Sequence, residues 1–90
     1  MIQRRFSIAG TDEYILMSLE TGLVGSDQHY CDVSIRGSVF SFEERIYGID
    51  SLQALLIALK LAGRIIRESE FANTHEVFWL EPGDDMGIPL

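Results

Sequence analysis

An apolar run with a helical period, at residues 50–68, constrains the fold of this chain more than any other feature. It is the only segment long enough to form a full helix. At 3.6 residues per turn its polar side chains fall on one narrow stripe, formed by Gln53, Lys60, Arg64 and Arg67. The sequence therefore predicts one long helix that lies on an apolar surface.

The start of this helix is signalled by Asp50 and Gln53, which have the spacing of a capping box. The apolar arc is wider than a helix on a protein surface needs, so either another segment of the chain or a second chain is expected to cover its flanks. Ala54, Ala58 and Gly63 place small residues on this arc, which lets the helix backbone approach a sheet closely.

Most of the remaining chain alternates apolar and polar residues with a period of two, which predicts strands. In the first strand the even positions, from Ile2 to Ile8, are expected to face inward. Residues 21–28 are rich in glycine and polar residues and are predicted to form the longest loop between strands. The predicted strands are residues 2–8, 14–20, 30–36, 39–47 and 76–80.

Four strands, a helix and a fifth strand predict a single α+β domain over residues 1–90. We expect a five-stranded, mostly antiparallel sheet in the order 5-1-2-3-4, with the long helix packed on one face. In the alternative order the fifth strand lies parallel to the fourth, after a right-handed crossover.

The chain has 7 basic and 14 acidic residues and a net charge of -7, which argues against a nucleic-acid partner. No apolar stretch is long enough for a membrane span and no signal peptide is evident, so we expect a cytoplasmic protein that does not enter a membrane. The single Cys31 excludes an intrachain disulfide and a multi-cysteine zinc site.

One helix covers only one face of a sheet, so the opposite face is the first candidate for function. Tyrosine, tryptophan and arginine are enriched at binding hot spots, and this face is predicted to hold several. It could contact a partner protein or form a homodimer. The alternative is a solvated face with cross-strand pairs such as Arg36 with Glu43. The predicted contact residues are Arg5, Tyr14, Tyr30, Arg36, Arg45 and Trp79.

A second candidate surface is the acidic end of the chain, which contains Glu81, Asp84 and Asp85 around a glycine turn. Its spacing does not fit a calcium-binding loop. The side chains could instead bond nearby amides within a turn, or form an acidic patch that meets a basic partner.

No catalytic constellation is apparent, and the sequence predicts neither a metal nor a cofactor. Asp27, His29 and Cys31 alternate and could be joined with His75 in a metal or nucleophile site, but Cys31 belongs to the apolar set of its strand. A small buried core residue is the better interpretation of Cys31.

Two short motifs stand out: the Asp-Ser-Leu-Gln-Ala-Leu run at residues 50–55 and the Pro-Gly-Asp-Asp-Met-Gly-Ile-Pro ending at residues 82–89. In these motifs the chain resembles a family of short bacterial proteins of unknown function. The resemblance implies a small cytoplasmic bacterial protein and supplies no activity or catalytic residue.

These observations predict a small acidic protein without catalytic activity that acts as a protein-interaction module, of a regulatory or immunity/inhibitor type. Opposite charge would speed its association with a basic partner. The alternative is a small-molecule binder or weak hydrolase, with a site between residues 21–28 and the C-terminal segment that uses His29 and Asp84 or Asp85.

Overall fold

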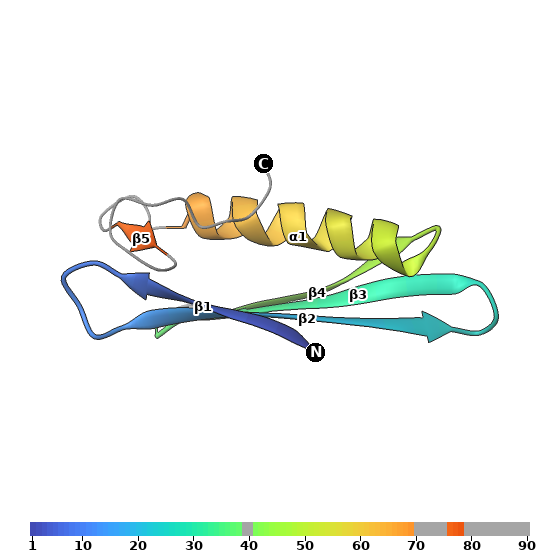
Figure 1. Cartoon of the computed structure of the whole chain (residues 1–90), viewed down its shortest axis with the longest axis horizontal. Helices are drawn as coiled ribbons and strands as arrows, with labels where there is room; N and C mark the ends of the chain where they lie inside the picture. Colours follow the sequence, from blue (N-terminus) through green and yellow to red (C-terminus); the bar gives the residue numbers. More distant parts are fainter. Residues whose placement is uncertain (39–40, 70–75, 79–90) are drawn as a thin grey trace.

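A computed structural model of the chain describes residues 1–38, 41–69 and 76–78. An antiparallel sheet forms one layer and a single long helix lies across one of its faces (Figure 1). The predicted α+β fold with an antiparallel sheet and one helix is therefore confirmed. The elements are β1 (Ile2–Ile8), β2 (Tyr14–Val24), β3 (Gln28–Arg36), β4 (Ser41–Gly48), α1 (Ser51–Arg67) and β5 (Val77–Phe78).

Neighbouring strands pair antiparallel in the order β4-β3-β2-β1. β5 adds two residues beside β1, where Phe78 pairs with Ser7 and Val77 with Ile8. The predicted fifth strand, residues 76–80, extends beyond the described residues, so its full length stays a prediction. The predicted strand 39–47 likewise begins outside them, and its described part is β4.

The predicted loop at residues 21–28 is wrong. β2 continues to Val24 and β3 begins at Gln28, so only a tight turn separates them, in which Gly25 adopts a positive φ of 67°. The glycine content was interpreted as a loop signal, but Gly22 pairs directly with Tyr30 in the ladder. A glycine in a strand often marks a place where another group approaches closely, and here the Tyr30 ring occupies the space that a Cβ atom would need.

α1 begins as the sequence predicts. Asp50 is the N-cap, and its Oδ1 accepts a hydrogen bond from the Gln53 backbone N–H at 2.7 Å. Gln53 Oε1 accepts in turn from the backbone N–H of Ile49, at 2.6 Å, rather than from Asp50. This arrangement satisfies the Gln53 amide, which has no partner inside the helix, and the amide of Ile49 just before the helix.

Small residues bring α1 close to the sheet, as predicted. Ala54, Ala58, Ala62 and Gly63 are all buried. A Cβ atom added to Gly48 would lie 2.5 Å from the backbone nitrogen of Ala54, so only glycine leaves room for the first helical turn at the end of β4.

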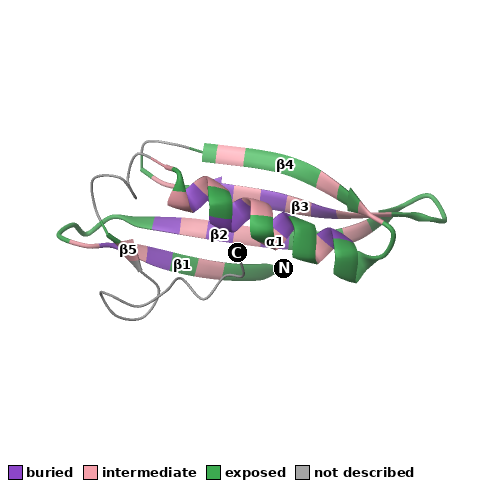
Figure 2. Cartoon of the chain, turned by 90° about the horizontal axis from the view of Figure 1, so that it is seen from above, coloured by how far each residue is buried: buried purple, intermediate pink, exposed green. Residues whose placement is uncertain are grey.

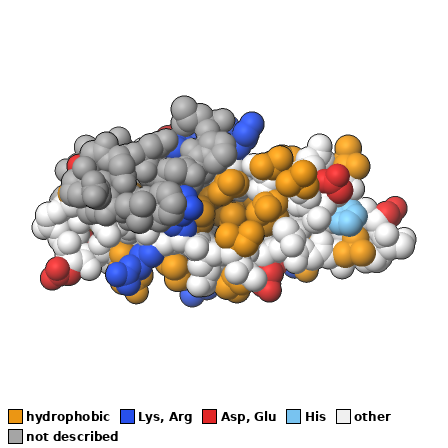
Figure 3. All heavy atoms as spheres, viewed as in Figure 1, with side chains coloured by type: hydrophobic (Ala, Val, Ile, Leu, Met, Phe, Trp, Pro, Cys, Tyr) orange, Lys and Arg blue, Asp and Glu red, His pale blue; other side chains and the backbone are white. Residues whose placement is uncertain are grey.

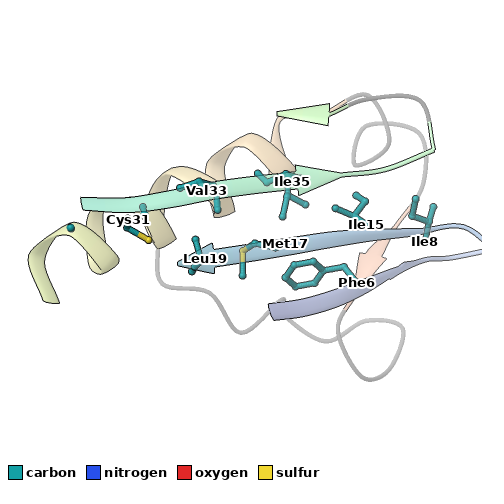
Figure 4. Close-up of a cluster of buried hydrophobic side chains, with 12 residues drawn as sticks. Phe6, Ile8, Ile15, Met17, Leu19, Cys31, Val33 and Ile35 are labelled. Atoms are coloured by element: carbon teal, nitrogen blue, oxygen red, sulfur yellow. The ribbon is translucent and has the colours of Figure 1, made fainter. Parts of the chain in front are cut away.

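The core lies between α1 and the inner strands (Figure 2). The predicted period of two is confirmed in β2 and β3, where alternate residues are buried and their side chains gather with Phe6 and Ile8 on the helix side (Figure 4). Ile2 pairs with Leu19 at the start of β1 and therefore faces the helix side, as predicted, but it is 53% exposed. It lies beside a hollow that α1 leaves open. The buried strand residues are Phe6, Ile8, Ile15, Met17, Leu19, Cys31, Val33 and Ile35.

Candidate functional site: the open face of the sheet

The face of the sheet opposite α1 is the surface that sequence patterning singles out. Residues directly opposite one another in an antiparallel ladder point to the same side, and the register pairs Arg5 with Leu16 and Leu16 with Arg36. The same rule joins Asp32 with Arg45. We call this surface the open face. The predicted contact residues that lie on it are Arg5, Tyr14, Tyr30, Arg36 and Arg45, whereas Trp79 lies outside the described residues.

Arg45 is the centre of an ordered cluster on the β3–β4 half of the open face. Its Nε and a terminal guanidinium nitrogen donate to the two Asp32 carboxylate oxygens, at 2.8 and 3.0 Å. The guanidinium also lies over the Tyr30 ring, 3.8 Å from its centroid. Two-point pairing and stacking together fix the orientation of a side chain that is otherwise flexible. We call Tyr30, Asp32, Arg45 and the exposed neighbour Tyr47 the Arg45 cluster.

Gly22 supports this cluster from β2. The hydroxyl end of the Tyr30 side chain occupies the position that a Cβ atom of residue 22 would take, so the ring reaches over the neighbouring strand. Covering a glycine with an aromatic side chain from the adjacent strand is a recognised way to stabilise a sheet. The ring is therefore held by the glycine on one side and by Arg45 on the other.

Further pairs of the open face lie at the other end of β3 and β4 and on β1 and β2. Arg36 forms an ion pair with Glu43, at 2.6 Å, and its Nε donates to the Ser34 hydroxyl at 3.3 Å. The predicted cross-strand pair of Arg36 and Glu43 is thus confirmed. Arg5 lies over the Tyr14 ring, 4.8 Å from its centroid. An exposed ion pair contributes little to stability, so these contacts arrange the surface more than they stabilise it.

The electrostatics of the Arg45 cluster follow from the pairing. The hydrogen bond from Arg45 lowers the pKa of Asp32 below its ordinary value, and the charge of Arg45 adds to the effect. The hydrogen bond to Asp32 likewise raises the pKa of Arg45, with smaller contributions from Tyr30 and Tyr47. On the described open face the arginines are balanced by Glu20, Asp32 and Glu43. The acidic surplus of the chain therefore lies elsewhere.

Among the described residues, the hollows of the open face show no nucleophile paired with a histidine base. One, of about 440 Å³, lies beside Tyr14 and Leu16 at the end of the β1–β2 hairpin. Another, of about 420 Å³, follows β3 and β4 past Asp32 and Arg45. Their charged groups are carboxylates and guanidinium groups, and neither contains a serine or cysteine beside a histidine.

The described residues give little support to the other candidate sites, which involve Cys31 and His29. Cys31 is fully buried, and burial raises the pKa of its thiol, which disfavours the reactive thiolate. His29 pairs with Leu23 inside the ladder instead of lying in a loop. Residues 1–38, 41–69 and 76–78 contain no group of three potential metal ligands close together. His75, Glu81, Asp84 and Asp85 lie outside the described residues.

The full sequence was compared with known protein families, curated proteins and solved structures. A family model described as "Domain of unknown function (DUF6968)" matches residues 2–90. The chain belongs to this family. No curated protein and no solved structure gives a significant match. Membership of DUF6968 agrees with the predicted resemblance to an uncharacterised family and assigns no activity to the open face.

Another surface of this DUF6968 chain is apolar and lies on the flank of α1 beside the start of β1. Leu56, 46% exposed, lines one hollow with Ile2, and Leu52, 62% exposed, lines an adjoining hollow with Leu56. Figure 3 shows apolar side chains gathered on the side of the molecule where α1 overlies the sheet. The wide apolar arc predicted that a flank of the helix would need a cover. Within the described residues, no helix has the length and apolar character required to cross a bilayer.

Sequence reasoning identified the residues of the open face but missed how they are joined. The two-point pairing of Arg45 with Asp32 depends on the exact register of β3 and β4, which alternation alone does not set. The glycine-rich composition of residues 21–28 favours a loop, so it does not predict the contact of Gly22 with Tyr30. An isolated glycine in an alternating segment is the signal that points to such a close approach.

Proposed function

We propose that this chain is a non-catalytic protein-interaction module that binds a basic partner protein, as a regulator or inhibitor of that partner in the bacterial cytoplasm. The observation that supports this function best is the Arg45 cluster, a set of aromatic and charged side chains held on a face that α1 does not cover.

The cluster has the properties of a contact surface because its side chains are already ordered. Association costs free energy for every flexible side chain that it immobilises. Arg45 is held by Asp32 and Tyr30, and Tyr30 by Gly22, so little ordering is left for the partner to impose. Tyr47, 54% exposed, adds an aromatic side chain at the border of the cluster.

The charge of the chain supports a basic partner. The open face itself is nearly neutral, but the molecule around it has a net charge of -7. A field of one sign steers an oppositely charged protein toward the surface, and the matched groups on the face then set its orientation. The acidic end with Glu81, Asp84 and Asp85 would add to this field.

A capture experiment with the tagged full chain tests this function. The bait is incubated with bacterial lysate, and captured proteins are quantified for the native chain and for Arg45→Ala and Tyr47→Ala. We expect a basic protein whose capture weakens at least about tenfold in Arg45→Ala, as for a hot-spot residue. A variant with Asp84→Lys and Asp85→Lys measures the contribution of the acidic end.

Arg64→Ala is the matched control, because it removes an exposed arginine from the outer side of α1. Thermal unfolding of every variant verifies that the fold is intact. The proposed function is refuted when no basic protein is captured, or when Arg45→Ala and Arg64→Ala lose the same proteins to the same extent.

A further inference from the structure

The outer edge of β4 is a second unused feature of the sheet, adjacent to the Arg45 cluster. β4 pairs with β3 over eight consecutive residue pairs, from Ser41 opposite Arg36 to Gly48 opposite His29. It stands last in the sheet order, and no strand within the described residues pairs with its other side. A long free edge presents a row of backbone donors and acceptors on which another strand can add.

The helix-facing side chains of β4 give this edge a specific pattern. Phe42 and Ile46 are half-buried and pack against the core, whereas Glu44 between them is exposed. Glu43 and Arg45, which point to the open face, are paired with Arg36 and Asp32. Glu44 forms no salt bridge with any described residue. On the helix side, the edge strand therefore presents an apolar, an acidic and an apolar side chain in succession.

Ile57 extends the apolar part of this pattern above the sheet. Leu59 lines the hollow next to β1, and Ile57 lies roughly 160° away from it around the helix axis. Ile57 is therefore on the flank of α1 that faces β4, and it is 44% exposed. A strand added to β4 would bring its helix-facing side chains beneath Ile57.

A lone inward-pointing charge on an edge strand also has a protective role, because it discourages pairing with most other strands. A second copy of this chain, paired through the same edge and centred on Glu44, would place two Glu44 carboxylates next to each other. An incoming strand with a lysine or arginine at that position would instead gain an ion pair. Glu44 thus favours the binding of a strand with a basic side chain at this position over the binding of neutral or acidic strands.

We propose that the outer edge of β4 binds an extended segment of the basic partner, which adds as a strand with the pattern apolar-x-Lys/Arg-x-apolar. The basic side chain lies opposite Glu44, and the apolar side chains lie next to Phe42 and Ile46, beneath Ile57. This inference rests on the proposed function, since it describes how a basic partner would be held beside the open face.

The test uses the full chain and a synthetic nine-residue peptide, acetyl-Ser-Thr-Val-Thr-Lys-Thr-Val-Thr-Ser-amide. Its pattern reads the same in both directions, so parallel and antiparallel binding are both sampled. The titration is followed by amide NMR spectra. We expect saturable shifts in the amides of β4 and at Ile57. Replacing the central lysine by glutamate should weaken binding about fivefold or more, since the cross-strand interaction with Glu44 changes from attraction to repulsion.

Variants of the chain separate specific from general charge effects. Glu44→Lys should reverse the preference, so that the glutamate peptide binds better than the lysine peptide. Glu13→Lys makes the same change of net charge at the β1–β2 turn and should leave the preference unchanged. A peptide N-methylated at its five central residues lacks the backbone donors needed for pairing and should not bind.

Three results would overturn this inference: no saturable binding at millimolar peptide, equal affinity for the two peptides, or shifts confined to residues away from β4. If the Glu44→Gln variant forms dimers in light scattering and the peptide does not bind, the edge would instead be a contact site for a second copy of this chain. The peptide replaces the cellular partner, so its failure to bind refutes the edge site alone, whereas failed capture from lysate refutes the proposed function.

Discussion

At the scale of single residues, the pair of Asp32 and Arg45 links stability to surface order. Both side chains are more than a third exposed, at 44% and 41%, so solvent screens their attraction. The pair therefore stabilises the fold only slightly. Its main effect is to hold the Arg45 guanidinium over Tyr30, at 3.8 Å.

The lowered pKa of Asp32 gives this pair a measurable pH dependence. Its ordinary value is 3.8, and the folded-state value lies lower because of the hydrogen bond from Arg45. The stabilisation is present above the unfolded pKa and is lost as pH falls through the folded pKa. Asp32→Asn should therefore lower the Tm slightly at neutral pH, with a difference from the native chain that shrinks below pH 3.8. Thermal unfolding from pH 2 to 7 checks this; a difference that grows in acid contradicts it.

At the scale of elements, the start of α1 is the feature best specified by local sequence. The Asp50 side chain caps the Gln53 amide at 2.7 Å, as the spacing of these two residues predicts. Asp50→Ala should destabilise the protein by about 1 kcal/mol, the typical cost of a lost N-cap. This corresponds to a Tm decrease of about 4–8 °C for a domain of this size.

Ser51→Ala is the control for this prediction. Ser51 is the next residue and is exposed, and its hydroxyl has no hydrogen-bond partner within the described residues. Equal losses of stability for Asp50→Ala and Ser51→Ala, measured by thermal unfolding, would show that the cap does not have the role assigned to it.

Gly48, near this cap, makes a close backbone contact that sequence periodicity does not predict. The period of two places Gly48 just after the predicted strand 39–47 and gives it no further role, but its missing Cβ lets the backbone of Ala54 approach. Gly48→Ala should destabilise the protein by about 1–3 kcal/mol, the cost of overpacking, because the clash is with backbone that cannot rotate away. Urea unfolding of Gly48→Ala and of the native chain measures this loss, and an equal free energy of unfolding for the two would contradict it.

At the scale of the whole molecule, alternation and helical period predict the layers well. The inward sets of β2 and β3 and the helix bounds follow from sequence because each has one buried and one exposed side. Ile2 departs from the pattern because α1 does not cover the beginning of β1, a consequence of how two elements meet. The contacts of Arg45 with Asp32 and of Tyr30 with Gly22 depend on strand register, which no local pattern contains.

The central claim is that α1 covers one side of the sheet and leaves the other accessible. Hydroxyl-radical footprinting of the full chain at low concentration tests it most directly, because tyrosine and methionine both react rapidly. Tyr14 and Tyr47, 48% and 54% exposed, should be modified at rates close to that of exposed Met1, while buried Met17 is protected. Protection of Tyr14 and Tyr47 to the level of Met17 in the monomer would show a covered face and contradict the account.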